Sequence, residues 1–186
     1  MEKTRKILDT ALRLFVEFGF HGTPTSKIAQ EAGVANGTLF NKFATKDDLI
    51  VALYVDITRR MSEYVAENTI VEQSLKETMK GYYLASLYWA LDNNIEFRFV
   101  QQFKASPFIL LIAPEELEKS YKPFFDMLRQ GTSEHLFKPL PIDYLSTMII
   151  SHTYGINEYL IKNQFPKVRQ HAIISESFEL LWGMIT

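Results

Sequence analysis

Apolar residues recur along the first part of the chain with the spacing of amphipathic helices. Between residues 3 and 19 they fall every three or four positions, which predicts one helix with a buried stripe that ends at Gly19. Thr23 is a capping residue and precedes a short second helix, which Gly33 ends. A third short helix is predicted to open near Asn36, with its apolar side chains toward the core.

The helical pattern continues to the last residues. Thr45 is placed to cap a fourth helix over about 46–68, with acidic residues in its first turn. Pro123 predicts a kink in a later helix, and Gly131 a weak point in the same element. No segment alternates as a strand does, so the pattern predicts an all-α fold with about nine helices. The helices predicted after the fourth cover 72–92, 95–105, 115–136, 142–163 and 167–185.

The second and third helices have the layout of a helix-turn-helix. In such a motif the first helix supports the second, a tight turn joins them, and the second helix presents side chains to base edges in the major groove. Gly33 permits the left-handed backbone that a tight turn uses. The third helix has a polar set without an obvious structural role, namely Ala35, Asn36, Gly37, Thr38, Asn41 and Lys42.

These residue types suit DNA. Asparagine pairs bidentately with adenine, and threonine or alanine contacts the thymine methyl group. Gly37 lets the backbone approach the duplex closely, while Thr25 and Lys46 flank the reading helix and suit phosphate oxygens. An αα-hairpin packed in a core is the alternative interpretation of the same pattern. A basic arm of Lys3, Arg5 and Lys6 could add phosphate contacts, but a solvated terminus fits that segment equally well.

The segment resembles the DNA-binding domain of the TetR family of bacterial transcriptional regulators. The resemblance implies an N-terminal three-helix domain over 1–47 and a larger helical domain for ligand binding and dimerisation over 48–186. The fourth helix would connect the two domains. The matching residues are Ile7, Ala11, Phe15, Gly19, Phe20, Thr23, Ile28, Ala29, Ala32, Gly33, Val34, Gly37, Thr38, Leu39, Phe40, Phe43, Lys46, Asp48 and Leu49.

Three residues depart from the usual pattern of that family. Pro24 stands where Thr or Ser is common, which shifts the expected cap of the second helix to Thr23. Phe40 replaces a frequent Tyr and Ala35 a frequent Ser, and each change removes one polar contact to DNA. We therefore expect the affinity to depend mainly on Thr25, Asn36, Asn41, Lys42 and Lys46, with Ala35, Gly37, Thr38 and Phe40 completing the surface.

Charge and composition agree with this interpretation. The net charge is −2, yet residues 1–60 hold nine Lys or Arg against seven Asp or Glu, so the basic excess lies with the motif. The chain has no cysteine, which excludes disulfides and thiolate zinc sites. Its longest apolar run, 108–113, is far shorter than the roughly 20 residues of a membrane helix. We expect a cytoplasmic protein without membrane association, metal site, cofactor or catalytic residues.

Aromatic residues concentrate in the middle helices and predict a largely apolar effector cavity, although any one of them can equally fill core. The last two helices have wide apolar faces, which predict pairing across a two-fold axis and therefore a near-palindromic operator. The ligand residues proposed on this basis are Tyr83, Trp89, Phe99, Phe103, Tyr121, Phe125 and Tyr154. The dimer residues are Met148, Ile149, Ile156, Tyr159, Ile174, Phe178, Leu181 and Trp182.

The sequence thus predicts a homodimeric DNA-binding regulator, a repressor that a small hydrophobic or aromatic effector releases from double-stranded operator DNA. Two alternatives stay open. One is a DNA-binding regulator without an effector, which a solid second domain would favour. The other is an enzyme or lipid carrier that retains a helix-turn-helix without using it.

Overall fold

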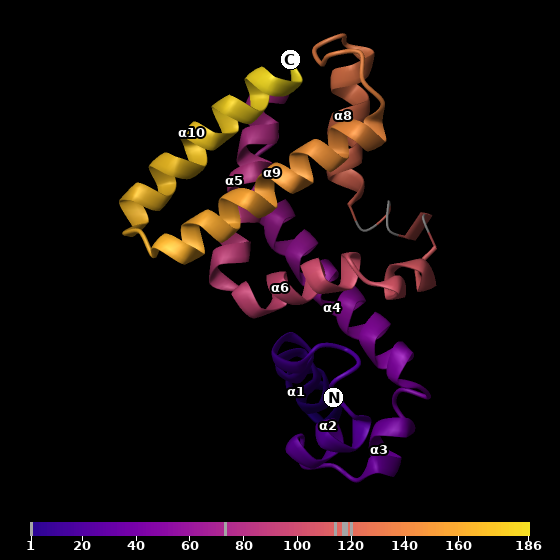
Figure 1. The fold of residues 1–186 in the computed structure, drawn as a ribbon. Coiled ribbons are helices and arrows are strands. Elements are labelled where there is room, and N and C mark those ends of the chain that lie inside the picture. Colours follow the sequence, from indigo (N-terminus) through magenta and orange to yellow (C-terminus); the bar gives the residue numbers. More distant parts are fainter. Residues whose placement is uncertain (1, 73, 114, 117–118, 120) are drawn as a thin grey trace. The chain divides into compact units, whose positions relative to one another are not determined.

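The structure, a computed structural model, describes residues 2–72, 74–113, 115–116, 119 and 121–186. Within these residues it contains nine α-helices, one 3-10 helix and no strand, which confirms the predicted all-α fold. The helices are α1 (Glu2–Phe18), α2 (Thr25–Glu31), α3 (Asn36–Phe40), α4 (Lys46–Glu67), α5 (Leu75–Asp92), α6 (Asn94–Lys104), η1 (Pro107–Leu111), α8 (Lys122–Ser133), α9 (Ile142–Asn163) and α10 (Lys167–Ile185) (Figure 1).

The chain forms two compact units, and their limits differ from the predicted boundary after residue 47. The first unit comprises Met1–Arg60 and Asn93–Glu116, and the second comprises Met61–Asp92 and Leu117–Thr186. The first unit extends beyond the helix-turn-helix because α6 packs on α1 and on the first part of α4. This division depends on which apolar helix faces pack against one another, and local sequence patterns do not show that.

An aromatic cluster forms the core of the first unit. The rings of Phe15, Phe20 and Phe99 lie 5.4 to 6.3 Å apart, in tilted and edge-to-face arrangements. Tyr54 of α4 stacks on Phe103 of α6 with ring centroids 4.1 Å apart. Such pairs stabilise by about 0.5–1.5 kcal/mol each beyond the area they bury. They fix α1, α4 and α6 as the scaffold of the DNA-binding motif.

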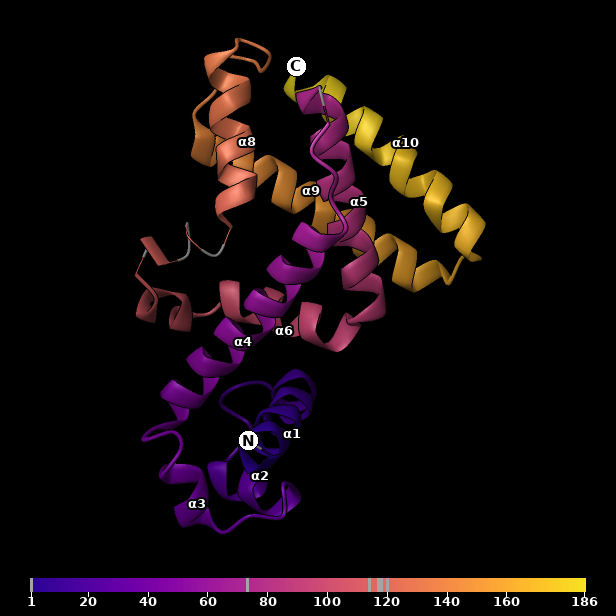
Figure 2. The same cartoon turned by 180° about the vertical axis from the view of Figure 1, so that it is seen from behind.

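The second unit is built around α5, with α8, α9 and α10 packed on it (Figures 1 and 2). Side-chain pairs show that α5 and α10 run antiparallel. Lys80 contacts Glu179 near the start of α5, and Tyr83 contacts Ser177 one turn further along. Tyr88 contacts His171 near the end of α5. This alignment brings the end of α5 and the start of α10 to the same side of the unit.

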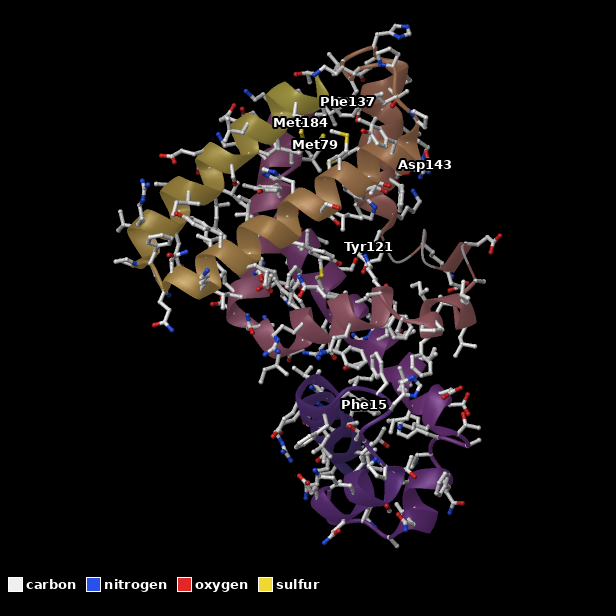
Figure 3. All side chains as sticks on the ribbon, in the orientation of Figure 1. Phe15, Met79, Tyr121, Phe137, Asp143 and Met184 are labelled. Carbon is white, nitrogen blue, oxygen red and sulfur yellow. The ribbon has the colours of Figure 1, made fainter. Side chains whose placement is uncertain are left out.

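The predicted helix over 115–136 is shorter in the structure. It begins at Lys122, and Pro123 lies in its first turn. A backbone N–H in the first turn has no acceptor within the helix, so a proline there removes no helical hydrogen bond and causes no kink. Residues 117, 118 and 120 of the predicted helix lie outside the described residues. Gly131 is a packing requirement rather than a weak point, because a Cβ there would lie 2.1 Å from the Phe137 ring. Figure 3 shows Phe137 beside the last turns of α10, where its ring contacts Trp182.

Two kinds of feature are missing from the described residues. None of the helices there combines enough length with enough apolar character to cross a lipid bilayer. No group of three or more His, Asp or Glu side chains is arranged there to hold a metal ion.

Candidate nucleic-acid interface

The loop between α1 and α2 is fixed by a buried threonine. Gly19 adopts φ +74°, and its N–H donates to the Phe15 carbonyl at 2.9 Å, which closes α1. The Thr23 hydroxyl is fully buried and lies 2.8 Å from the Gly19 carbonyl and 3.1 Å from the Leu14 carbonyl. The prediction that Thr23 caps α2 is therefore wrong. Its hydroxyl is turned inward, and Pro24 occupies the cap position without a side-chain hydrogen bond.

The turn between α2 and α3 has the expected glycine geometry. Gly33 adopts φ +66°, the left-handed conformation that favours glycine. The Val34 N–H donates to the Ala29 carbonyl at 3.0 Å, and the Gly33 N–H donates to the Gln30 carbonyl at 3.1 Å. These bonds satisfy the carbonyls at the end of α2 and direct the chain into α3, which begins after Ala35.

Helix α3 has one buried and one exposed face. Leu39 is fully buried and Phe43, just beyond the helix, is nearly so, which anchors α3 to the unit. Thr38 is half-buried, and Phe40 is 46% exposed. The remaining predicted reading residues are all exposed, namely Ala35, Asn36, Gly37, Asn41 and Lys42. Five of the six predicted reading residues are thus accessible to solvent, and their contacts with DNA stay a prediction.

The flanks of α3 hold the two predicted phosphate ligands. Thr25 opens α2 and is half-buried. Lys46 opens α4, where burial lowers the pKa of its ammonium group while Asp47 opposes that shift. Thr45 and Asp48 confirm the predicted cap of α4. The Asp48 N–H donates to the Thr45 hydroxyl at 3.0 Å, and the Thr45 N–H donates to the Asp48 carboxylate at 2.9 Å.

Several other cations of the first unit have partners within the described residues. Lys27 lies over the Phe18 ring at 3.8 Å from its centroid. Lys6 pairs with Glu2 at 2.8 Å, and Arg5 contacts Asp9 at the same distance, so neither belongs to a free basic arm. Lys42 and Lys46, beside α3, have no ion-pair partner within the described residues and are available to meet DNA.

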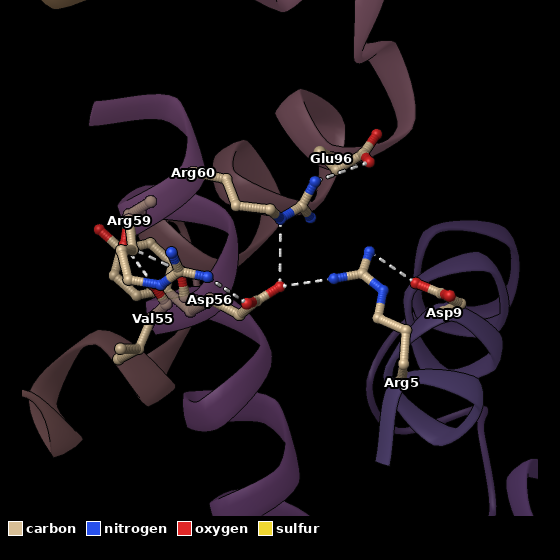
Figure 4. Close-up of polar contacts among 9 residues, drawn as sticks. Arg5, Asp9, Val55, Asp56, Arg59, Arg60 and Glu96 are labelled. Atoms are coloured by element: carbon tan, nitrogen blue, oxygen red, sulfur yellow. Dashed lines mark hydrogen bonds and ion pairs between the residues drawn. The ribbon is translucent and has the colours of Figure 1, made fainter. Parts of the chain in front are cut away.

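A charge cluster joins the three scaffold helices of this unit (Figure 4). The Asp56 carboxylate of α4 accepts from Arg5 of α1 at 3.1 Å and from Arg60 at 3.2 Å. It also accepts from Arg59 at 3.1 Å. Arg60 reaches Glu96 of α6 at 3.6 Å. One carboxylate therefore contacts three guanidinium groups and connects α4 directly to α1.

Replacing Asp56 with asparagine is expected to lower the free energy of unfolding by about 1–2 kcal/mol, because three arginines lose their shared anion. Urea denaturation followed by circular dichroism measures the change. Asp9→Asn serves as the matched control, since among the described residues Asp9 pairs with Arg5 alone and is more exposed than Asp56. A loss at Asp56 no larger than at Asp9 would show that the cluster adds nothing beyond a surface ion pair.

Gly37 offers a test that separates folding from DNA binding. A Cβ at Gly37 meets no protein atom within 4 Å, so nothing inside the molecule requires glycine there. Gly37→Ala is therefore expected to stabilise the fold by up to about 1 kcal/mol through helix propensity. The added methyl group is expected to weaken operator binding by about tenfold, since it stands where the backbone would meet the base edges. Unchanged affinity in a fluorescence anisotropy titration would contradict a close approach of α3.

The seven predicted ligand residues do not form one group. Phe99 and Phe103 are fully buried in the core of the first unit, so we remove them from the set. The sequence did not predict this burial, because the aromatic residues of α6 suit the wall of a ligand cavity as well as a core. Only the contacts of α6 with α1 and α4 show that it belongs to the core of the first unit. The other five belong to the second unit, where Tyr83 and Trp89 are buried and Tyr121, Phe125 and Tyr154 are half-buried.

Four of the eight predicted dimer residues lie in the core of the second unit rather than on its surface. Ile149, Ile174, Phe178 and Leu181 are buried within the core of their own protomer. Their apolar faces pack on α5, which the sequence did not identify as the partner of the last two helices. Met148, Ile156 and Trp182 are half-buried, and Tyr159 is 49% exposed.

Comparison with known proteins supports the assignment of the N-terminal segment. The family model described as bacterial regulatory proteins, tetR family, matches residues 7–53. The HTH-type transcriptional repressor AcnR of Corynebacterium diphtheriae is 36% identical over 70 residues, which cover 38% of this chain and 37% of that protein. The sequence match therefore spans less than half of that relative.

Solved structures extend the similarity to the rest of the chain. A protein from Shewanella sp. PV-4, described as a candidate tetR family regulator, is 29% identical and covers 98% of this chain, and 97% of its own chain is covered (TM-score 0.91). FadR from Bacillus subtilis, solved with stearoyl-CoA, is 23% identical (TM-score 0.77). That alignment covers 98% of this chain and 99% of FadR, and at this identity it shows the fold alone.

The matched segment contains α2, the glycine turn and α3, and the all-helical remainder has the fold of solved tetR family structures. Residues 7–53 thus match the tetR family of bacterial regulatory proteins, and the chain as a whole shares its fold with a solved structure described as a tetR family regulator.

Proposed function

We propose that the protein is a sequence-specific transcriptional repressor that binds double-stranded operator DNA. The observation that carries the proposal is the surface of α3, on which Asn36, Gly37 and Asn41 are exposed while Leu39 is buried beneath them. A helix held in this way presents amides to base edges in the major groove. Thr25 and Lys46 flank it and suit the phosphates on either side.

The proposed active form is a homodimer, since two copies of α3 are needed to read a near-palindrome. With four predicted dimer residues buried in the protomer, the exposed apolar side chains of α9 and α10 are the better candidates for the interface. Tyr144 and Tyr159 of α9 are about half exposed, and Leu180 of α10 is 73% exposed. Gly155 and Gly183 on the same helices have open space around them, which permits close approach by a partner helix.

The proposed effector is a small, largely apolar or aromatic molecule bound by the second unit. FadR, whose fold this chain shares, was solved with stearoyl-CoA. Of the predicted ligand residues in that unit, Tyr121, Phe125 and Tyr154 are half-buried, and Tyr83 and Trp89 of α5 are buried. Asn157 is fully buried, and neither of its amide atoms has a hydrogen-bond partner among the described residues. An unpaired buried amide is the kind of polar anchor that ligand cavities use.

Effector binding would act as a population shift between DNA-binding and released conformations. Helix α4 is the proposed link, because it starts beside α3 at Lys46 and its last residues, from Met61, belong to the second unit. The DNA that the protein would bind lies in the cytoplasm, and the proposal places the protein there.

The unpaired amide of Asn157 gives a stability prediction. Replacing Asn157 with leucine, which has a similar volume, is expected to raise the free energy of unfolding of the ligand-free protein by about 1–3 kcal/mol, the penalty of an unsatisfied buried polar group. Urea denaturation measures it, with the exposed Asn163 replaced by leucine as control. Destabilisation by Asn157→Leu would show that the amide has a structural partner such as bound water, and would remove it as a ligand anchor.

The proposed function is tested by genomic selection followed by a reporter assay. Purified protein is incubated with fragmented genomic DNA, and the recovered fragments are sequenced and then placed upstream of a reporter gene. Recovery of one near-palindromic sequence, with lower reporter output when the protein is expressed, supports repression. Higher output would establish an activator, and recovery without sequence preference would contradict the function.

A further inference from the structure

A pocket in the second unit lies where the end of α5, the last part of α4 and the start of α10 meet. Its volume is about 500 Å³, within the range of small-molecule sites. Tyr64 of α4, Tyr88 and Leu91 of α5, and His171 of α10 line it. None of these residues belongs to the predicted ligand set, and Asn157 is not among the lining residues. The pocket therefore shares no lining residue with the effector site of the proposed function.

One wall of the pocket is a flat aromatic surface. The rings of Tyr88 and His171 are parallel to within 4°, with centroids 6.3 Å apart. The Tyr88 hydroxyl and His171 Nδ1 share a hydrogen bond, which fixes the two rings as neighbours in one surface. The Tyr64 hydroxyl has no hydrogen-bond partner within the described residues. Planar π-systems bind such surfaces by offset stacking.

Two opposite charges stand at the rim. Asp92 is the last residue of α5, and Lys167 is the first residue of α10, each one turn beyond the Tyr88 and His171 pair. Both side chains are exposed, and within the described part of the chain neither has an ion-pair partner. Lys167 also stands in the first turn of its helix, where a cation is disfavoured, and no acidic residue accompanies it there.

We propose that this pocket binds a zwitterionic aromatic molecule of the aromatic amino acid class. The ring stacks on the Tyr88 and His171 surface, the ammonium group pairs with Asp92, and the carboxylate pairs with Lys167. A ligand with both charges uses both unpaired rim groups at once, whereas a purely anionic or cationic ligand meets one of them as a like charge. Leu91 supplies the apolar floor beneath the ring.

The test uses isothermal titration calorimetry of the full-length protein without DNA, so that its outcome does not depend on the repressor function. Three probes isolate the two charges: L-tryptophan, tryptamine, which lacks the carboxylate, and indole-3-propionate, which lacks the ammonium group. L-tryptophan is expected to bind with a Kd on the order of 1 mM or lower and about tenfold more tightly than either analogue.

Two variants assign the charges to their partners. Asp92→Asn is expected to weaken the binding of L-tryptophan and tryptamine by about tenfold and to leave the binding of indole-3-propionate unchanged. Lys167→Gln is expected to weaken the binding of L-tryptophan and indole-3-propionate by about tenfold and to leave the binding of tryptamine unchanged. Glu158→Gln and Lys162→Gln are the matched controls, because both residues are exposed on α9 outside the pocket. No saturable binding of L-tryptophan, equal affinity for all three probes, or equal losses in pocket and control variants would overturn the proposal.

Discussion

Replacing Asn41 and Lys46 together with alanine is expected to weaken operator binding by about 100-fold or more, while folding and dimerisation stay intact. A base-reading contact such as that proposed for Asn41 is worth about 1–3 kcal/mol, Lys46 adds a phosphate contact, and a dimer loses both contacts at each half-site. Asn41 is exposed, and Lys46, in the first turn of α4, is half-buried. Neither side chain has a hydrogen bond within the described residues, so their loss should not disturb the fold. Fluorescence anisotropy with the selected operator measures the affinity.

The two substitutions are separable by their effect on selectivity. Asn41→Ala is expected to relax base preference at one position of each half-site, whereas Lys46→Ala lowers affinity for all sequences and reduces the salt dependence. A control with Lys162 and Asn163 replaced by alanine removes the same two groups from α9, in the second unit. Equal affinity of the control and the test variant would contradict an interface at α3.

Replacing Gly131 with alanine is expected to lower the free energy of unfolding by about 1–3 kcal/mol, as overpacking of a filled core does. The new Cβ would lie 2.1 Å from a Phe137 ring that is only 6% exposed. The backbone cannot yield easily, because the Gly131 carbonyl accepts from the N–H groups of Leu136 and Phe137. Urea denaturation measures the loss through a lower midpoint.

Gly81 provides the matched control for that substitution. It lies inside α5, and a Cβ there meets its nearest neighbour, Thr69, at an ordinary 3.7 Å. Gly81→Ala is expected to stabilise by about 0.5–1 kcal/mol, since alanine favours the helix. If both alanine variants gained stability, the contact between Gly131 and Phe137 would not be a constraint of the fold.

Local signals in the sequence were enough to predict the DNA-binding motif. The turn at Gly33 is set by a backbone conformation that glycine favours, and the cap at Thr45 is set by a residue three positions away. The exposed face of α3 follows from a single helical period. Each of these features depends on neighbours within one or two turns of the chain.

Features that depend on distant residues were not predictable in the same way. Phe99 and Phe103 were expected beside a ligand because their helix is apolar and aromatic, yet α1 and α4 bury them. Arg59 and Arg60 stand three and four residues after Asp56, so their pairing is readable from helical spacing. The contact of Asp56 with Arg5, 51 residues away, depends on the fold.

Hydroxyl-radical footprinting of the selected operator tests the central claim most directly. A dimer with two α3 helices in successive major grooves is expected to protect two symmetric windows whose centres lie about 10 base pairs apart, or a multiple of that spacing. Both windows should disappear with the Asn41 and Lys46 variant. A single window, protection without symmetry, or protection that survives the double substitution would contradict DNA reading by α3 in a homodimer.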